Sequence, residues 1–275
     1  MIDFVLKDRY NIADFVLLID LLRSESGCPW DRVQTHESIG QNMLEEAYEA
    51  VEAIDEGDPL HLCEELGDLL MQVIFHTSIE KDAGRFDIDD VSDMACKKLI
   101  ERHPHIFSDV KVSGADEVLF NWDRIKQKKR GQDTHASAMD GISSALPALI
   151  RAEKIQKKAA SVGFDWPDVS GALLKLDEEV AELKEGISAD DLDNIAEELG
   201  DIMFATVNVA RFYKLHAESL LSAACNKFLN RFRYLEEGAQ SRGLRLEDMS
   251  LAEMEEIYQE ARHELEGKEP EFNFA

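Results

Sequence analysis

The chain has 275 residues, of which 44% are hydrophobic, and its formal net charge is −27 at pH 7. This hydrophobic fraction is enough for packed cores and excludes a disordered chain. The negative charge argues against nucleic acid as a direct ligand, because phosphate backbones bind clusters of lysine and arginine. It fits a protein that binds cations, one that meets basic partners, or one whose acidic helix faces are simply solvated.

Cysteine spacing and hydropathy further narrow the class of protein to which the chain can belong. The four cysteines are far apart and form no CxxC pair. We therefore expect reduced thiols rather than a disulfide framework or a zinc site. The longest uncharged apolar stretch, about Leu69 to Ile79, is too short to span a bilayer. No signal peptide is visible, so we expect a cytoplasmic protein without membrane contact.

Helical periodicity runs along the chain, and no segment reads as a convincing strand. In the first half we expect helices after Asn11, from a cap at Ser38, from Pro59 and from about Asp89, then a loop over 108–116 and a short helix around Trp122. In the second half we expect helices over 148–160, 169–186, 189–213 and 250–265, and one around Lys227 that ends before a loop near Gly238. These elements predict an all-α protein.

Two acidic helices joined by a turn form the most distinctive stretch. Glu46 and Glu49 share a face of the first helix, and Glu65 and Asp68 share a face of the second. Asp58 suits the N-cap of the second helix. Antiparallel packing would bring the four carboxylates together beside an apolar layer of Leu62, Leu66, Leu69 and Leu70. The first helix is expected to bury Ile39, Met43, Ala47, Ala50 and Ile54.

The same stretch occurs twice. Glu179, Glu182, Glu198 and Asp201 repeat the four acids at a displacement of 133 residues, and six further positions keep that displacement without a gap. We interpret this as an internal duplication that produces two tandem helical bundles. We place the first domain at 1–130, a linker at 131–146 and the second domain at 147–275.

Four converging carboxylates repel one another unless a cation lies between them or some are protonated. Oxygen ligands favour hard cations, Mg²⁺ first and then Mn²⁺ or Ca²⁺. No histidine follows any of these acids by three residues, which argues against a di-iron carboxylate bundle. The alternative for a single tetrad is a solvated acidic face, but the recurrence of the tetrad favours a site.

Pairs of cations and single aromatics follow each acidic stretch. The cations are four apart on one helix face, as Lys98 with Arg102 and Lys227 with Arg231. Such pairs can bind a polyphosphate, although ordinary basic surface pairs have the same spacing. Trp122 and Tyr258 come late in each half and are either platforms for a base or core aromatics. The chain has no GxxxxGK[ST] loop, so side chains and metal would have to hold a triphosphate.

Several motifs together resemble the MazG family over nearly the whole chain. They include CPW from Cys28, LEEAYE from Leu44, EELGDLL from Glu64, RHPHIF from Arg102, KKAASVGFDW from Lys157, EEVAE from Glu178 and EELGD from Glu197. The resemblance implies two tandem MazG-like domains and a homodimer. It implies a Mg²⁺-dependent nucleoside triphosphate pyrophosphohydrolase, which cleaves NTPs and dNTPs of many bases to the monophosphate and pyrophosphate. It also implies a role in clearing nucleotides or limiting ppGpp.

Carried onto this chain, the resemblance makes the second half the main catalytic one. It implies metal ligands at Glu179, Glu182, Glu198 and Asp201. It implies nucleotide contacts at Lys175, Leu176, Asp177, Glu178, Glu179, Asn194, Ile195, Ala196, Glu197, Lys227, Arg231 and Tyr258. The family commonly has Trp where this chain has Tyr258. Glu178 or Glu179 would take the proton from water, and Lys175, Lys227 and Arg231 would stabilise the leaving pyrophosphate.

Two other functions remain open at this point. A nucleotide or metal sensor would use the same helices without turnover. An interaction protein would use its acidic surface to bind a basic partner, but that function gives no reason for the tetrads and cation pairs to recur.

Overall fold

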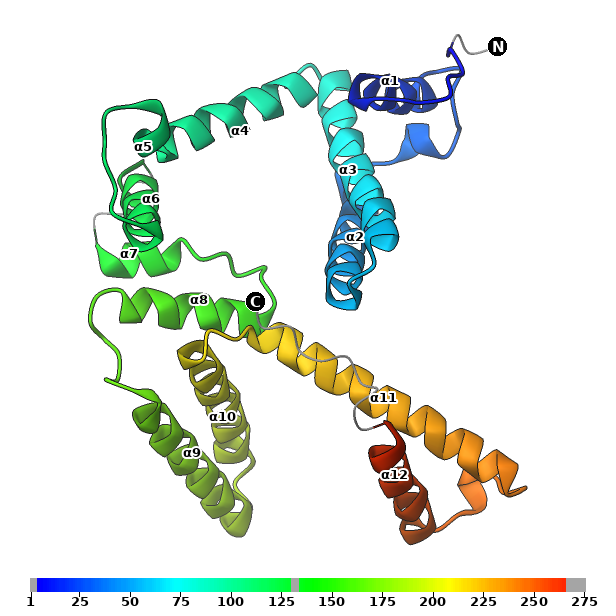
Figure 1. The fold of residues 1–275 in the computed structure, drawn as a ribbon, viewed down its shortest axis with the longest axis vertical. Coiled ribbons are helices and arrows are strands. Elements are labelled where there is room, and N and C mark those ends of the chain that lie inside the picture. The colour runs from blue at the N-terminus through cyan, green and yellow to red at the C-terminus, as the bar shows by residue number, and fades with distance from the viewer. Residues whose placement is uncertain (1–3, 130–133, 266–275) are drawn as a thin grey trace. The chain divides into compact units, whose positions relative to one another are not determined.

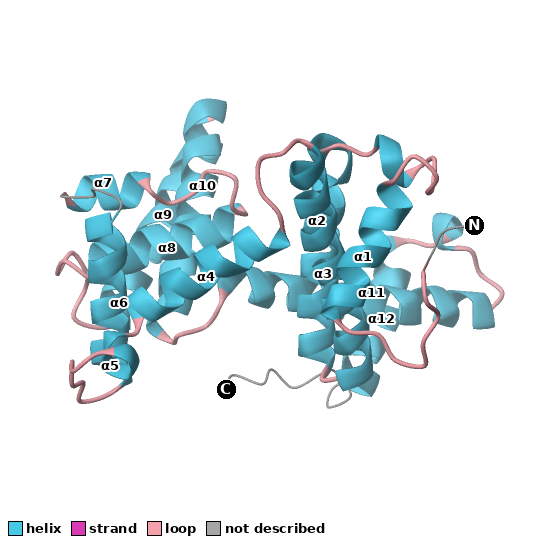
Figure 2. Ribbon diagram, turned by 90° about the horizontal axis from the view of Figure 1, so that it is seen from above, coloured by secondary structure: helices cyan, strands magenta, loops and turns pink. Residues whose placement is uncertain are grey.

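The computed structural model describes residues 4–129 and 134–265, and every regular element in these ranges is a helix (Figures 1 and 2). The α-helices are α1 (Ile12–Arg23), α2 (His36–Glu56), α3 (Pro59–Asp82), α4 (Ile88–Arg102), α5 (Pro104–Phe107), α6 (Ala115–Lys129), α7 (His135–Asp140), α8 (Ala148–Ala160), α9 (Val169–Ala189), α10 (Leu192–Phe212), α11 (Ala217–Ser241) and α12 (Leu251–Leu265). The prediction of an all-α protein is confirmed. None of the described helices is both long enough and apolar enough to cross a membrane.

The duplication is visible as two helical hairpins, α2–α3 and α9–α10. The helices α9 and α10 begin 133 residues after α2 and α3, the same displacement that the acids show. Each hairpin turns through one residue with left-handed backbone, Gly57 (φ 68°) or Asp190 (φ 55°). The next residue, Asp58 or Asp191, caps the following helix with its carboxylate. The two turns therefore have the same construction.

The first compact unit comprises residues 1–123. Helix α1 packs on α3, and the core contains Ile19, Ile39, Ile74 and Phe75. The buried Arg23 guanidinium donates hydrogen bonds to Ser78 Oγ (3.2 Å) and Asp82 Oδ2 (2.9 Å). These bonds fix α1 along the second half of α3, so the acidic end of the α2–α3 hairpin stays uncovered by α1.

A polar network joins the start of α2 to the end of α3. The rings of His36 and His76 stack at 5.0 Å, with 2.7 Å between their Nδ1 atoms. His36 Nε2 lies 2.5 Å from Glu80 Oε1, and the Arg85 guanidinium donates two hydrogen bonds to the same carboxylate. The Arg85 bonds, with a smaller contribution from His36, lower the pKa of Glu80 to about 2.

The second compact unit comprises residues 124–275. Here α8 packs on α10 and α11, and α12 packs on α11. Its core joins Val207, Ala210 and Ala217 to half-buried Leu149 and Leu220. The division between the units lies inside α6, before the predicted boundary at residue 130. The predicted linker contains α7, and its first residues, 131–133, lie outside the described part of the chain.

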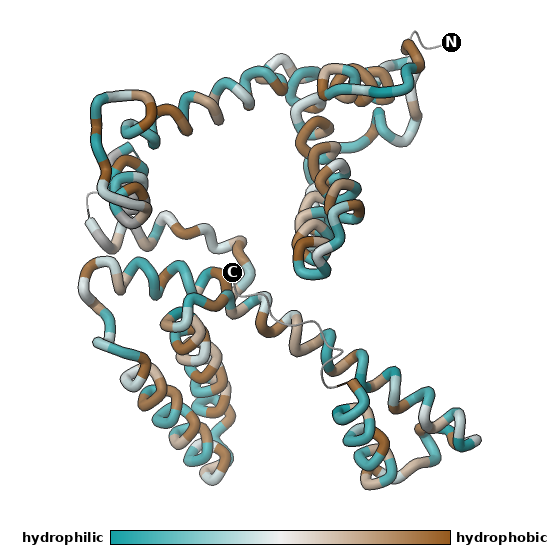
Figure 3. The backbone as a smooth tube through the Cα atoms, in the orientation of Figure 1, coloured by the Kyte–Doolittle hydropathy of each residue, from teal (hydrophilic) through white to brown (hydrophobic). Residues whose placement is uncertain are grey.

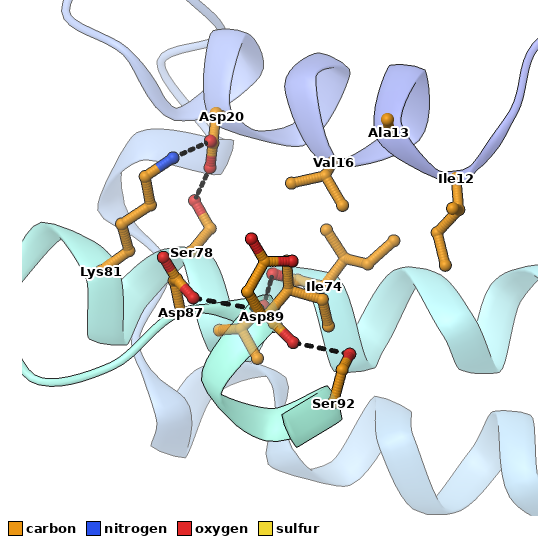
Figure 4. A pocket seen from close by; sticks show the side chains of 12 residues that line it. Ile12, Ala13, Val16, Asp20, Ile74, Ser78, Lys81, Asp87, Asp89 and Ser92 are labelled. Atoms are coloured by element: carbon orange, nitrogen blue, oxygen red, sulfur yellow. Dashed lines mark hydrogen bonds and ion pairs between the residues drawn. The ribbon is translucent and has the colours of Figure 1, made fainter. Parts of the chain in front are cut away.

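A cavity of about 340 Å³ lies between α1, α3 and the start of α4 in the first unit (Figure 4). It is lined by Ile12, Ala13, Val16, Asp20, Ile74, Thr77, Ser78, Lys81, Asp87, Ile88, Asp89 and Ser92. In the second repeat the position of Ile74 is Val207 and that of Asp87 is Leu220, and there the first turn of α11 packs over Val207. Helix α4 begins only at Ile88, so the same place stays open. No acid of either tetrad lines this cavity.

Several expected details are wrong. Thr35, not Ser38, is the N-cap of α2, with Ser38 completing its capping box. The spacing Ser188-x-x-Asp191 predicts that these two residues cap α10, but Ser188 lies inside α9, and Asp191 is the N-cap. Gly238 lies within α11, where a Cβ atom would come within 2.8 Å of Ile257 on α12. The glycine therefore permits close helix packing rather than a loop.

Two apolar residues that were expected to be covered are exposed. Ile54 on α2 is 57% exposed and Leu66 on α3 is 50% exposed. Helical spacing alone predicted their burial, but the α2–α3 contact covers only one face of each helix. The remaining apolar side chains of the hairpin stay on the surface.

The Glu80 network predicts a pH-dependent stability. The pKa of Glu80 is about 2 in the folded protein, against 4.5 for an unperturbed glutamate. The charged form therefore stabilises the fold above pH 4.5, and this stabilisation is lost as the pH falls from 4.5 towards 2. Glu80→Gln should lower the thermal midpoint at pH 7, and the difference from wild type should shrink below pH 4.5. Calorimetry from pH 7 to pH 3 measures this, with exposed Glu25→Gln as the control. A difference that stays constant over this range would contradict the assignment.

Candidate functional site

Three acids of the first repeat converge at the turn-proximal part of the α2–α3 hairpin. Glu46 and Glu49 come from α2 and Glu65 comes from α3, and one carboxylate oxygen of each lies within 4.8 Å of the others. Glu65 is buried, Glu46 is half-buried and Glu49 is exposed. The helical spacing of three that the sequence shows thus places these side chains together.

The second repeat builds the same arrangement and buries it more deeply. Glu179 and Glu182 come from α9 and Glu198 comes from α10, again with one oxygen of each within 4.8 Å of the others. Glu179 and Glu198 are buried, at 4% and 6% exposure, and Glu182 is half-buried. We call these three residues the second acid cluster, and Glu46, Glu49 and Glu65 the first acid cluster.

The fourth acid of each tetrad lies farther out. Neither Asp68 nor Asp201 joins the three carboxylates within 4.8 Å. Both are still close enough to act electrostatically, because Asp68 helps to raise the pKa of Glu46 and Asp201 helps to raise that of Glu198. Each tetrad is therefore three converging acids with a fourth acid beside them.

Crowding shifts the protonation of the second acid cluster. A hydrogen bond with Glu179, together with burial, raises the pKa of Glu182. Burial and then the charge of Glu179 raise the pKa of Glu198. Glu179 shifts the other way, because its hydrogen bond with Lys175 lowers its pKa. The ionised form of Glu179 is thus favoured, whereas Glu182 and Glu198 resist ionisation without a further cation.

A buried oxygen in the second acid cluster has no partner. Glu198 Oε1 accepts a hydrogen bond from Asn194 Nδ2 at 3.0 Å, whereas the buried Oε2 has no hydrogen-bond donor among the residues that the structure describes. Buried carboxylate oxygens in proteins are normally paired, because desolvating one without a partner is costly. Hard divalent cations prefer oxygen ligands, carboxylates among them. The donor set of Glu179, Glu182 and Glu198 therefore fits Mg²⁺ or Mn²⁺.

Lys175 is the cation beside the second acid cluster. Its Nζ atom lies 2.9 Å from Glu179 Oε1 and 2.9 Å from Glu178 Oε1. These bonds, to Glu179 first, raise the pKa of Lys175 well above its usual range. Lys175 is three and four residues before its partners on α9, so the contact follows directly from helical geometry.

The first acid cluster has different neighbours. Asn42 takes the place of Lys175, and His61 takes the place of Asn194, with its Nε2 atom 3.2 Å from Glu65 Oε1. Gln72 Nε2 lies 3.4 Å from Glu46 Oε1. Burial raises the pKa of both Glu46 and Glu65, aided by the charge of Asp68 on Glu46 and of Glu49 on Glu65. Without a lysine, neither of these two acids has its pKa lowered in the way that Glu179 has.

Two contacts near the second acid cluster were not predicted from the sequence. Asn194 holds Glu198, and Gly186 leaves room for the side chain of Asn194. A Cβ atom on Gly186 would come within 2.2 Å of Asn194 Oδ1, so only glycine lets α10 bring this amide against α9. The sequence contains only a weak sign of this close contact, because a glycine within a helix indicates no more than a lower helix propensity. His61 was likewise missed because it lies four residues before Glu65, not three after an acid.

The remaining predicted nucleotide contacts lie on the two hairpin helices of the second unit. Leu176 and Asp177 precede the acids on α9, and Ile195, Ala196 and Glu197 precede Glu198 on α10. Leu176 and Ile195 are half-buried, and the other three are exposed. They border the second acid cluster along the sequence, and their contact with a nucleotide stays a prediction.

The cation pairs and aromatics lie on other helices. In the first unit, the Arg102 guanidinium lies 5.0 Å from the centre of the Trp122 ring, and His103 meets that ring edge-on. Lys98 is exposed on α4, which packs on α3 and α5. Trp122 is half-buried, and part of its surface is already covered by these neighbours. The structure thus joins Arg102 to Trp122 and does not join either to the first acid cluster.

In the second unit, Lys227 and Arg231 lie on α11 and Tyr258 lies on α12. The Tyr258 ring packs against Phe228 with 5.9 Å between centroids. Figures 1 and 2 both place α12 apart from α9 and α10. A single chain therefore does not bring Tyr258 beside the second acid cluster.

The chain is similar to known proteins over most of its length. It matches the MazG nucleotide pyrophosphohydrolase domain twice, over residues 34–107 and 169–235, and each match contains one acid cluster. It is 42% identical over 244 residues to the nucleoside triphosphate pyrophosphohydrolase of Escherichia coli K12, covering 87% of this chain and 92% of that protein.

Two further relatives agree with these matches. The chain is 41% identical over 249 residues to the nucleoside triphosphate pyrophosphohydrolase/pyrophosphatase MazG of Thermotoga maritima, covering 90% of this chain and 94% of that protein. It is 47% identical over 254 residues to the uncharacterized protein YabN of Bacillus subtilis, covering 92% of this chain but 52% of that protein. With two domain matches and near full-length relatives, the chain belongs to the MazG nucleotide pyrophosphohydrolase family.

Proposed function

We propose that this protein hydrolyses nucleoside triphosphates to the monophosphate and pyrophosphate, with Mg²⁺ held by the second acid cluster. The observation that carries the proposal is the buried Glu198 oxygen without a partner, among three converging carboxylates next to Lys175. The names of the Escherichia coli and Thermotoga maritima relatives support the substrate class. Glu179, Glu182 and Glu198 would hold the cation, with Asp201 beside them. Nucleoside triphosphates are abundant in the cytoplasm, so we place the activity there.

When bound, Mg²⁺ would supply charge neutralisation for the triphosphate oxygens. The chain's own residues then have separate tasks. Glu178 stands next to the cluster with a side chain that is 56% exposed, so it can take a proton from an attacking water. The bond that breaks is a phosphoanhydride, and pyrophosphate leaves with its negative charge. Lys175 is placed at the cluster to stabilise that charge.

The proposal includes broad tolerance for the base. Neither GxGxxG nor a P-loop is present to impose a fixed pose on the nucleotide. Stacking on an aromatic ring such as Tyr258 would accept every base, because each has a π-face. Clearance of unwanted nucleotides or control of ppGpp is a physiological role consistent with such tolerance.

We further propose that the protein acts as a homodimer. Exposed apolar side chains recur on α9, α10 and α11, and Figure 3 shows apolar bands along α11. They include Leu173, Leu174, Met203, Phe204, Leu221, Phe228, Leu229 and Phe232. Exposed apolar side chains that gather on a few helices are typical of an interface. Because one chain holds α12 apart from α9 and α10, a second copy would supply its own Lys227, Arg231 and Tyr258 to the acids.

The first prediction for this function concerns the metal. Release of pyrophosphate from ATP or dATP should require Mg²⁺ or Mn²⁺ and stop on addition of EDTA, because all the proposed ligands are carboxylates. Readdition of Mg²⁺ should restore activity, and an unchanged circular dichroism spectrum in EDTA would exclude unfolding. Undiminished hydrolysis in metal-free buffer would refute the site.

The second prediction concerns the two repeats. The first acid cluster has Asn42 where the second has Lys175, and Asn42 offers no charge to the triphosphate. Loss of one charge-assisted contact made in the transition state costs roughly a factor of 30 to 1,000 in rate. Glu179→Gln should therefore abolish most turnover of ATP or dATP in the full-length protein, and Glu46→Gln should preserve most of it. The opposite pattern would mean that the repeats have exchanged roles.

The third prediction concerns assembly. Light scattering at micromolar concentration should give twice the 31.1 kDa mass of the chain. Leu229→Asp places a charge on the exposed apolar face of α11 and should shift the mass towards the monomer. Replacement of an exposed glutamate on the same helix, Glu236→Gln, is the control and should leave the dimer intact. A wild-type mass of one chain under these conditions would count decisively against the dimer.

A further inference from the structure

Both ion pairs that Lys175 forms are with acids of the proposed catalytic repeat. The ammonium shares 2.9 Å contacts with Glu178 and Glu179, and Glu179 is one of the three acids that converge. The same Glu179 carboxylate is needed by a divalent cation in the second acid cluster. A monovalent and a divalent cation on one buried carboxylate repel each other, and the low local dielectric strengthens that repulsion.

We propose that Lys175 is an exchangeable occupant of the second acid cluster, which a divalent cation displaces and which then turns to the triphosphate. This inference rests on the proposed function and adds an order of events to it. While Lys175 is bound to Glu179, its positive charge compensates an acid of the cluster and is not available to an anionic ligand. Once the cation replaces it, the ammonium is released for an anionic ligand, so the metal binds before the nucleotide.

The position of Lys175 allows such an exchange. Its side chain is 39% exposed, so part of the chain already lies in solvent, whereas the Glu179 side chain is 6% exposed and stays in place. Lysine is a compact charge on a flexible four-carbon stem. Glu178 is 56% exposed and accepts from the same ammonium, so it offers Lys175 a partner outside the three converging acids. The lysine can therefore leave Glu179 without losing every carboxylate contact.

A second, independent observation indicates that Lys175 does not compensate all the acids of the second acid cluster. Glu198 Oε2 stays buried without a partner even though Lys175 is bound to the neighbouring Glu179. The lysine thus compensates one of the acids and leaves another uncompensated. A divalent cation can bind oxygens of all three acids at once.

The first repeat is a built-in comparison. Asn42 stands at the place of Lys175, and the polar neighbours of its cluster are Gln72, 3.4 Å from Glu46, and His61, 3.2 Å from Glu65. No lysine has to leave this cluster. A lysine at this position should therefore weaken the binding of a divalent cation in either repeat, and of the two repeats only the second carries one.

The test measures metal binding without any nucleotide. Mn²⁺ is the probe, and the free ion is counted by electron paramagnetic resonance in titrations of the full-length protein. A background with Glu46→Gln and Glu65→Gln silences the first acid cluster, so the second is observed alone. In that background, Lys175→Met should bind Mn²⁺ more tightly by roughly fivefold or more, and Lys175→Arg should restore weaker binding. Lys184→Met removes one exposed lysine from the same helix and should change the affinity much less.

Hydrolysis provides the opposing readout. Lys175→Met should lower kcat for ATP at saturating Mn²⁺ although it binds the metal more tightly, a split that a merely structural lysine would not produce. The reverse graft, Asn42→Lys in a background with Glu179→Gln and Glu198→Gln, should weaken Mn²⁺ binding at the first acid cluster. This graft keeps the proposal testable if Lys175→Met fails to fold.

The outcomes separate this inference from the proposed function. Equal or weaker Mn²⁺ binding by Lys175→Met, in a protein that hydrolyses ATP with metal, would overturn the exchange and leave the function standing. Absence of both Mn²⁺ binding and hydrolysis in the wild-type protein would overturn the function itself. Tighter binding by Lys184→Met to the same extent as by Lys175→Met would also overturn the exchange, because general charge would then explain both.

Discussion

Repulsion among buried carboxylates is the constraint around which each repeat is built. Two antiparallel helices bring three glutamates to within 4.8 Å in both halves of the chain. Such an arrangement opposes folding unless cations or protons compensate it. The chain provides partial compensation through Lys175 and Asn194 in the second repeat, and through His61 and Gln72 in the first. Compensation stays incomplete, as Glu198 Oε2 shows, and this incompleteness is the physical basis for the cation that we propose at the second acid cluster.

Much of this could be predicted from the sequence because it depends on local geometry. Spacings of three on a helix and a fixed displacement of 133 residues predicted that Glu179, Glu182 and Glu198 would meet. The helix turn at Asp58 and Pro59 was also correctly predicted, since capping residues act on their own neighbours. Asp201 and Asp68 were placed with the others by the same spacing, yet they lie outside the converging groups. The acids that lie outside are aspartates, whose side chains are one methylene shorter than those of glutamates at the same spacing of three.

The rest depends on contacts that local pattern does not encode. Ile54 and Leu66 follow helical apolar spacing but are exposed, because periodicity identifies an apolar face without saying what covers it. Tyr258 was grouped with the acids because the resemblance places them in one site. The fold instead holds α12 on α11 and joins Tyr258 to Phe228. Residues that a family unites in one site can therefore lie on separate parts of a chain, and assembly of two chains provides a physical way to unite them.

The duplication shows how small changes can separate two copies of one scaffold. The hairpins begin at matching residues, turn in the same way and present the same acids. The copies differ in the residues that surround the acids, above all a lysine in one copy and an asparagine in the other. A neutral amide can only hydrogen-bond a carboxylate, whereas an ammonium also compensates its charge and lowers its pKa. In the function that we propose, the acids hold the cation, and the residue one turn before them determines which repeat can use that cation on a triphosphate.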